Sequence, residues 1–138
     1  MITLLYASLI VFLLIFLSVM IIVARVRGRV AIGDGGHETL RKRIRAHANL
    51  AEYAPLFLLI LFLLEFFKQE PWVIHMLGAS FFLGRAFHAY AFLVHEKYQE
   101  GKLIKSLHYR RIGMSLTFIP LLLAAGLGIG MALNGLVF

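Results

Sequence analysis

The sequence predicts an all-α integral membrane protein that folds as a bundle of four transmembrane helices. Of its 138 residues, 61% are hydrophobic, and its mean hydropathy is +0.86, whereas soluble domains are typically about 45–50% apolar. The apolar residues form four long blocks, at 2–24, 46–67, 72–94 and 112–133. Each block provides roughly the 20 residues that a helix needs to cross about 30 Å of hydrocarbon. Because little chain remains outside them, we expect one membrane-embedded domain over 1–138.

The first helix is expected over residues 2–24 and is interpreted as a retained span. No charge precedes its apolar run, which exceeds the roughly 7–15 residues of a secretory signal core and ends in basic residues instead of a small-residue cleavage site. The following segment, AIGDGGHETL, contains glycines that favour turns. It lacks both the Lys-Ser or Lys-Thr ending and the preceding strand of a phosphate-binding loop, so we interpret it as a turn.

The second helix is expected over residues 45–67, although its start could lie as early as Leu40. Pro55 falls inside it, where a proline removes a backbone hydrogen bond and commonly kinks the helix, which membrane helices tolerate. The third helix is expected over 72–94. Pro71 precedes it, and proline is favoured in the first turn of a helix.

The fourth helix is expected over residues 110–133. Its second half, AAGLGIGMALNG, spaces Gly126 and Gly130 four apart, and small residues at this spacing let membrane helices approach closely. Packing explains these glycines, so no chemistry is assigned to them. The chain has no cysteine, which excludes disulfides and thiolate metal sites, and we expect no metal site.

The net charge of +7 is distributed as a membrane-topology signal. Basic residues gather around the loops that follow the first and third helices: Arg25, Arg27, Arg29, Arg41, Lys42, Arg43, Arg45, Lys97, Lys102, Lys105, Arg110 and Arg111. The loop between the second and third helices has only one basic residue, Lys68. The positive-inside rule therefore places both basic loops in the cytoplasm and both termini on the non-cytoplasmic side. Membrane lipids are the expected surroundings, and nucleic acid is not an expected partner.

Polar side chains interrupt the start of the second helix, in the segment RIRAHANLAEYAP. At 3.6 residues per turn, Arg45, Asn49 and Glu52 fall on one face of this helix, whereas His47 points nearly the opposite way. A face of this kind inside an apolar span requires an explanation, because charged groups are costly in hydrocarbon.

The third helix contributes Arg85 and His88, which also share a face. Because neighbouring helices run in opposite directions, the rise per residue places Glu52 and Arg85 at the same depth, with Asn49 and His88 one level nearer the cytoplasm. We therefore expect a polar column in the cytoplasmic third of the bundle.

Two structural explanations compete with a ligand site. Arg45, like Arg110 and Arg111 where the fourth helix re-enters the membrane, could extend to the interface, as arginines at the ends of spans usually do. Glu52 and Arg85 could form only a structural ion pair. Buried ion pairs rarely stabilise a protein more than apolar replacements would, and intramembrane ionisable groups are functional candidates by default. So many polar groups at one depth favour a ligand site.

Several arginines that face one glutamate suit a small zwitterion with excess negative charge. Arginine forks bind carboxylates, and a glutamate can bind an ammonium group. A peptide-like thiol with two carboxylates and one amine has this pattern, and a neighbouring guanidinium would favour its thiolate at neutral pH. The adjacent lipid could deliver an apolar electrophile to that thiolate.

The segment RAHANLAEYAPLF (45–57) resembles the second-helix signature of the membrane-associated proteins in eicosanoid and glutathione metabolism, the MAPEG family, which includes microsomal glutathione transferases. GRAFHAYAF (84–92) is similar to the third-helix element of that family. AIGDGG and YRRIGMS (109–115) look most like its short bacterial branch. The resemblance implies a four-helix homotrimer in the bacterial inner membrane that binds glutathione between subunits, toward the cytoplasmic side.

The resemblance also implies roles for individual residues. It marks glutathione contacts on the second and third helices, an arginine on the fourth helix that stabilises the thiolate, and an arginine after the first helix that reaches the cofactor. The register of the last two positions is open by a residue. With Arg45 of the polar column and Tyr90 added, the expected glutathione-binding set is Arg25, Arg27, Arg45, Asn49, Glu52, Arg85, His88 and Tyr90, and the expected catalytic set is Arg110 and Arg111.

The leading functional hypothesis is a glutathione-dependent transferase that acts on lipophilic small molecules and could also reduce peroxides. Phe92 stands where eicosanoid-making members of the family often have a tyrosine, which disfavours oxygen-rich lipid chemistry. The alternative is a non-enzymatic membrane protein that holds lipid or glutathione in the same crevices. A small four-helix drug exporter fits the chain length, but such exporters usually carry a carboxylate in the first helix, which has none here.

Overall fold

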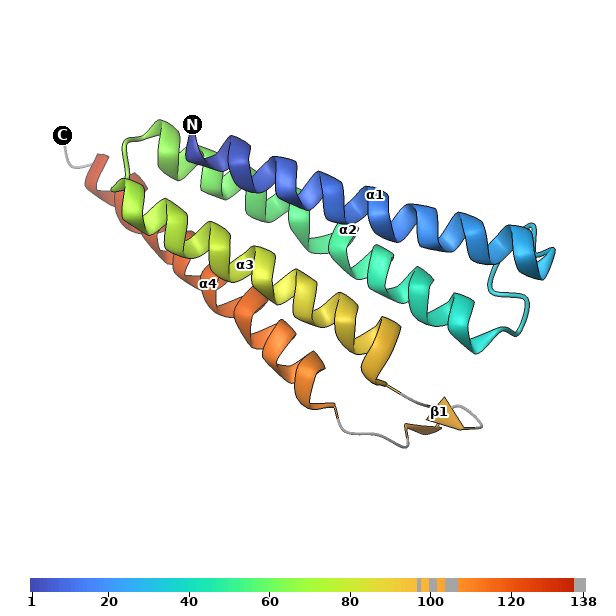
Figure 1. Cartoon of the computed structure of the whole chain (residues 1–138). Helices are drawn as coiled ribbons and strands as arrows, with labels where there is room; N and C mark the ends of the chain where they lie inside the picture. Colours follow the sequence, from blue (N-terminus) through green and yellow to red (C-terminus); the bar gives the residue numbers. More distant parts are fainter. Residues whose placement is uncertain (97, 100–101, 104–106, 136–138) are drawn as a thin grey trace.

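Four long helices lie side by side in one bundle, with both chain termini at the same end (Figure 1). This computed structural model describes residues 1–96, 98–99, 102–103 and 107–135. The helices are α1 (Ile2–Gly28), α2 (Glu38–Phe66), α3 (Pro71–Tyr90) and α4 (His108–Gly135). All four are long and apolar enough to cross a membrane, α3 together with the turn that continues it to His95. The predicted fold class is confirmed.

The connection from α3 to α4 contains the remaining regular elements. A π-helical turn, η1 (Ala91–His95), continues α3. Strands β1 (Tyr98–Gln99) and β2 (Lys102–Leu103) then form a two-stranded antiparallel hairpin in which Tyr98 pairs with Leu103. Lys97 and Lys105, which belong to the predicted basic loop, lie outside the described residues.

The helices extend beyond the spans predicted from hydropathy. α1 runs to Gly28, and α2 already begins at Glu38. Hydropathy marks where the hydrocarbon ends, whereas arginine and lysine have good helix propensity and let a helix continue into the headgroup region. The intervening loop turns at Gly33, Gly35 and Gly36, which all have positive φ, so the predicted glycine turn is present.

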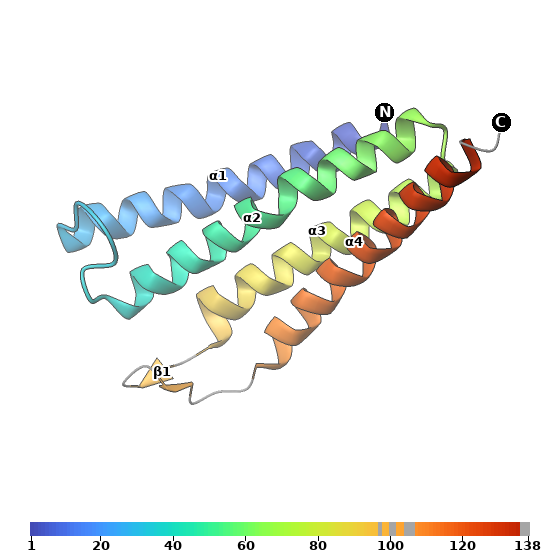
Figure 2. The same cartoon turned by 180° about the vertical axis from the view of Figure 1, so that it is seen from behind.

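The basic loops lie at the end of the bundle opposite the termini. Figure 1 and, from behind, Figure 2 show the α1–α2 and α3–α4 connections at one end and the N- and C-termini at the other. Lys68, in the α2–α3 connection, lies at the end with the termini. The positive-inside rule places the end with the basic loops in the cytoplasm, so it is called the cytoplasmic end below.

At the non-cytoplasmic end, α2 binds the first turn of α1. The backbone N–H groups of Ile2 and Thr3 donate hydrogen bonds to the two carboxylate oxygens of Glu65. The first amides of a helix have no partner within the helix, and a negative charge there complements the helix dipole. Glu65 therefore acts as a cap that α2 provides for α1.

The helices are arranged as two pairs, α1 with α2 and α3 with α4, which diverge toward the cytoplasmic end in both views (Figures 1 and 2). Phe57 of α2 and Phe81 of α3 stack across the middle with ring centroids 3.9 Å apart, and Leu17 and Leu61 belong to the same buried core. Large apolar side chains such as Leu122 remain exposed on the outside of the chain, as expected for surfaces that lipid or another protein chain covers.

The pair α3–α4 is joined through two glycines that sit backbone against backbone. A Cβ at Gly84 would lie 2.8 Å from the carbonyl carbon of Leu116, and a Cβ at Gly113 would lie 2.8 Å from the backbone nitrogen of His88. By contrast, a Cβ at Gly126 or Gly130 would meet nothing within 4 Å. The close approach predicted for Gly126 and Gly130 is thus not made within this chain, and the close contact lies nearer the cytoplasmic end.

We expect Gly113→Ala to destabilise the bundle, because the added methyl group must push α4 away from the rigid backbone of α3. Forcing extra volume into a packed contact typically costs about 1–3 kcal/mol. The free energy of unfolding, measured by denaturant titration in detergent micelles, would show the loss. Gly126→Ala is the matched control on the same helix. Equal stability of the two variants would contradict the proposed contact.

Candidate functional site

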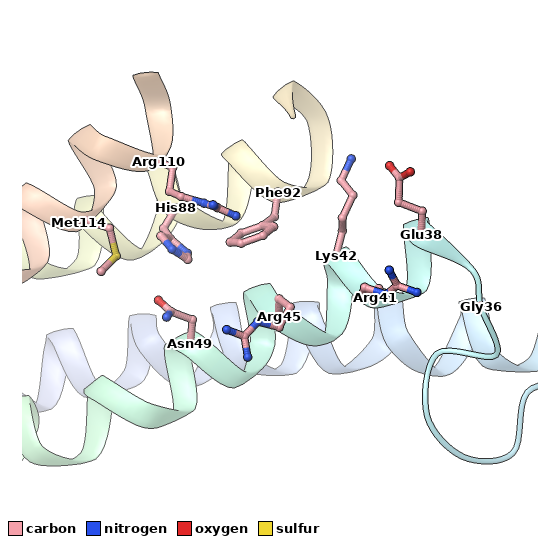
Figure 3. A pocket seen from close by; sticks show the side chains of 10 residues that line it. All are labelled: Gly36, Glu38, Arg41, Lys42, Arg45, Asn49, His88, Phe92, Arg110 and Met114. Carbon is pink, nitrogen blue, oxygen red and sulfur yellow. The ribbon is translucent and has the colours of Figure 1, made fainter. Parts of the chain in front are cut away.

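A cavity of about 600 Å³ lies at the cytoplasmic end, where the helix pairs diverge. One wall is α2, and the other is formed by α3, η1 and α4 (Figure 3). Its volume is within the roughly 300–1,000 Å³ of small-molecule sites. The residues that line it are Gly36, Glu38, Arg41, Lys42, Arg45, Asn49, His88, Phe92, Arg110 and Met114.

Helical spacing explains how the sequence builds these walls. Along α2, the lining side chains recur every three or four residues, from Glu38 to Asn49. His88 and Phe92 are four apart on the facing wall, and Arg110 and Met114 are four apart on α4. Four of the lining side chains are basic and one is a carboxylate, so the cavity favours an anionic occupant.

Arg85 lies behind the cavity and is 2% exposed. Its guanidinium donates one hydrogen bond to the Asn49 side-chain oxygen on α2 and another to the Thr117 hydroxyl on α4. Thr117 in turn donates to the backbone carbonyl of Gly113 at 2.7 Å. The Tyr53 ring centroid lies 5.5 Å from the guanidinium carbon of Arg85. This side chain therefore connects three helices at the level just below the cavity.

Glu52 does not meet Arg85, contrary to the ion pair considered from the sequence. Glu52 is exposed on α2, and no ion pair joins Arg85 to a carboxylate within the part of the chain that the structure describes. Depth along a helix is readable from sequence, but direction around the bundle is not. Asn49 reaches Arg85 first, and Glu52, three residues further on, points about 60° away from Asn49.

The cytoplasmic mouth of the cavity contains an ion pair that the sequence analysis missed. The Arg110 Nε lies 3.0 Å from an oxygen of the buried Glu96 carboxylate. The guanidinium carbon of Arg110 lies 4.2 Å from the Phe92 ring centroid, and the Lys42 ammonium donates to the Glu96 backbone carbonyl. Helical spacing from His88 and Phe92 does not identify Glu96, because the π-helical turn η1 changes the direction of the residue that follows it.

At the rim, Arg41 is held by the α1–α2 loop. Its Nε donates to the Asp34 carboxylate, and the Gly36 N–H donates to the same side chain at 3.0 Å. The Arg41 hydrogen bond and, after it, the Gly36 hydrogen bond keep the pKa of Asp34 below its usual value. The loop thus contributes its own acid to one edge of the cationic cavity.

Besides Glu52 and Arg85, four more residues of the expected sets lie outside the cavity. Arg25 donates to the backbone carbonyl of Ala31 at 2.9 Å, and Arg27 is exposed at the end of α1. Tyr90 packs edge-on against Tyr109 with centroids 5.2 Å apart. Arg111 is exposed on α4. Of the two candidate arginines on α4, the structure places Arg110, and not Arg111, in the cavity wall.

Four apolar spans and a cation-lined cavity at one end of the bundle define a small multi-pass membrane protein. A model of the MAPEG family matches residues 3–130, and the chain belongs to the MAPEG family. It is 36% identical over 123 residues to the inner membrane protein YecN of Escherichia coli K12, which covers 89% of this chain and 86% of YecN. The YecN of Escherichia coli O6:H1 strain CFT073 gives the same values.

These matches confirm the family resemblance seen in the motifs and agree with a multi-pass protein of the bacterial inner membrane. The name of the relative states a location and no activity. The family membership and the cavity therefore establish the kind of protein and leave its chemistry to be proposed.

We expect Thr117→Val to destabilise the bundle, because it removes the hydroxyl that accepts from the buried Arg85 guanidinium while keeping the shape of the side chain. Hydrogen bonds to charged groups contribute about 1.5–3 kcal/mol. Thr117→Ser, which keeps the acceptor, should lose much less. Ser115→Ala, on the exposed face of α4, is the control. An unfolding transition of Thr117→Val that matches the wild type would disprove this role.

Proposed function

We propose that the protein is a glutathione-dependent membrane transferase that conjugates the glutathione thiolate to lipophilic electrophiles at the cytoplasmic side of the bilayer. The observation that carries the proposal is the cavity lined by Arg41, Lys42, Arg45 and Arg110, which still outnumber the carboxylates in and beside it, those of Glu38, Asp34 and Glu96. A tripeptide with two carboxylates, one ammonium group and an ionisable thiol matches that excess of positive charge.

Residues on the two walls of the cavity would have different roles. Arg41, Lys42 and Arg45, on the α2 wall (Figure 3), are placed to bind carboxylates. Arg110, on the opposite wall, would stabilise a thiolate. When bound, glutathione supplies the nucleophilic sulfur, whose bond to the electrophilic carbon forms as the leaving group departs with its electron pair and the thiol proton passes to water. With a second glutathione molecule, the same thiolate could reduce a hydroperoxide to an alcohol and water, leaving glutathione disulfide.

We further propose that the active form is a homotrimer in which Glu52 completes the site of a neighbouring subunit. Glu52 is exposed within an apolar span, where contact with hydrocarbon would cost several kcal/mol on most scales. Covering by a second copy of the chain removes that cost and gives Glu52 a cation to bind, such as the ammonium group of the ligand. Arg25 and Arg27, which lie outside the cavity of their own chain, could approach a neighbouring site in the same way.

The second candidate is a non-enzymatic protein that holds an anionic lipid or glutathione in this cavity. It is favoured by the position of the cavity at the cytoplasmic end, since basic pockets between membrane helices on that side bind anionic headgroups. Tight co-purification of anionic lipid, without glutathione-dependent turnover, would support this candidate over the transferase.

The transferase proposal predicts that the purified protein conjugates a chromogenic aryl halide only when glutathione is present. Arg110→Met should lower the rate at saturating glutathione by about a hundredfold to a thousandfold, the range seen when a group that stabilises developing charge is removed. Arg111→Met should keep most of the rate, because Arg111 points away from the cavity. Wild-type protein that neither binds glutathione in a calorimetric titration nor turns over would refute the proposal.

A further inference from the structure

Two residues that contact Arg110 lie close together in the chain. Phe92 belongs to the π-helical turn η1, and Glu96 is the residue that ends this turn. Phe92 covers one face of the Arg110 guanidinium at 4.2 Å, measured from its carbon to the ring centroid, and Glu96 binds the Nε edge at 3.0 Å. Figure 3 shows Arg110 beside Phe92 on the wall formed by α4 and the end of α3. The guanidinium is therefore contacted on a face and on an edge by one short segment.

The π-helical turn is what aims Glu96 at Arg110. The Glu96 N–H donates to the carbonyl of Ala91, five residues back, at 2.8 Å. In an α-helix, residues four apart drift steadily around the axis, so His88, Phe92 and the residue at 96 would wind away from one face. A π turn holds more residues per turn and reverses that drift, and such turns occur frequently at functional sites. Without it, the carboxylate would point away from the cavity mouth.

The Glu96 side chain, including its carboxylate, is buried. It is 1% exposed, its carboxylate lies beside Arg110, and its backbone carbonyl accepts a hydrogen bond from Lys42 of α2. A buried carboxylate is stable only when it is paired in good geometry. Since Lys42 fixes the backbone and Arg110 the side chain, Glu96 has little freedom to move, and the orientation of the Arg110 guanidinium is fixed in turn.

We propose that Glu96 and Phe92 are positioning residues that fix the plane of the Arg110 guanidinium at the cavity wall, so that it stabilises an anionic sulfur bound there. The identity of the anion rests on the proposed function. The contacts by which Glu96 and Phe92 fix the orientation of Arg110 do not depend on that function. Glu96 acts through geometry, because its own negative charge, taken alone, would oppose an anion in the cavity. This opposition of geometry and charge makes the proposal testable.

The first experiment measures the holding of Arg110 without any glutathione. Detergent-purified protein is treated with phenylglyoxal, which modifies accessible guanidinium groups, and Arg110 and Arg111 are followed by mass spectrometry. Glu96→Ala should raise the modification rate of Arg110 about fivefold, the upper end of what a partly exposed ion pair contributes, and leave that of the exposed Arg111 unchanged. Equal Arg110 rates in wild type and Glu96→Ala would overturn the proposal.

The second experiment follows the ultraviolet absorbance of the bound glutathione thiolate against pH. Glu96→Ala and Phe92→Leu should each shift thiolate formation to higher pH by about one unit, a tenfold change in the thiolate-to-thiol ratio. Glu96→Gln keeps an oxygen for Nε and loses only the charge, so its thiolate should form at the wild-type pH or lower. If Glu96→Ala shifts in the same direction as Glu96→Gln, Glu96 acts only as a charge and the proposal fails.

The two experiments separate the two proposals. Wild-type protein that shows no bound glutathione overturns the proposed transferase function. In that case faster labelling of Arg110 in Glu96→Ala still supports the holding of Arg110 by Glu96, and unchanged labelling overturns it as well. Phe92→Tyr, which keeps an aromatic face, is the conservative control for Phe92→Leu and should keep the wild-type labelling rate of Arg110 in the first experiment.

Discussion

A guanidinium buried in the middle of a membrane-spanning bundle has to find its hydrogen-bond partners inside the protein, because hydrocarbon offers none. Arg85 does so by donating to Asn49 on α2 and to Thr117 on α4. The bonds reach Thr117 only because Gly84 and Gly113 let α3 and α4 touch through their backbones. The geometry of the cavity depends on these hydrogen bonds of Arg85, because they fix the position of α2 relative to α3 and α4.

The electrostatic character of the site follows from the same arrangement. Arg85 brings a positive charge to the base of the cavity, and the basic side chains of α2 and α4 surround the space above it. Charge interactions are much stronger beside low-dielectric hydrocarbon than in water. A bound anion would therefore strongly reduce the repulsion among the basic side chains at the cytoplasmic end. Glu96 is one of the acids near the cavity, with Glu38 and Asp34, and it pairs with Arg110.

The sequence predicted the fold better than it predicted the site. Block length and hydropathy identify four spans because both follow directly from bilayer thickness, and basic residues at alternate loops orient them. Helical spacing also brought Arg45, Asn49 and His88 to one cavity as expected. It could not give the direction of Glu52, because the rotation of each helix is decided by side-chain packing between helices.

Glu96 was out of reach for a different reason. Its position depends on a π-helical turn, and the extra residue in that turn has no periodic signature in the sequence. Thr117 was missed because a single hydroxyl in an apolar span resembles the other small residues of α4. The choice between Arg110 and Arg111 required the structure, since neighbouring residues on a helix differ by about 100° in direction.

The Glu65 cap on α1 has a consequence for how the protein enters the membrane. During synthesis α1 is exposed first, and its leading amides have no protein acceptor until the far end of α2 has crossed and delivered Glu65 to Ile2 and Thr3. The first helical hairpin is therefore secured at its outer end only when both arms are in place.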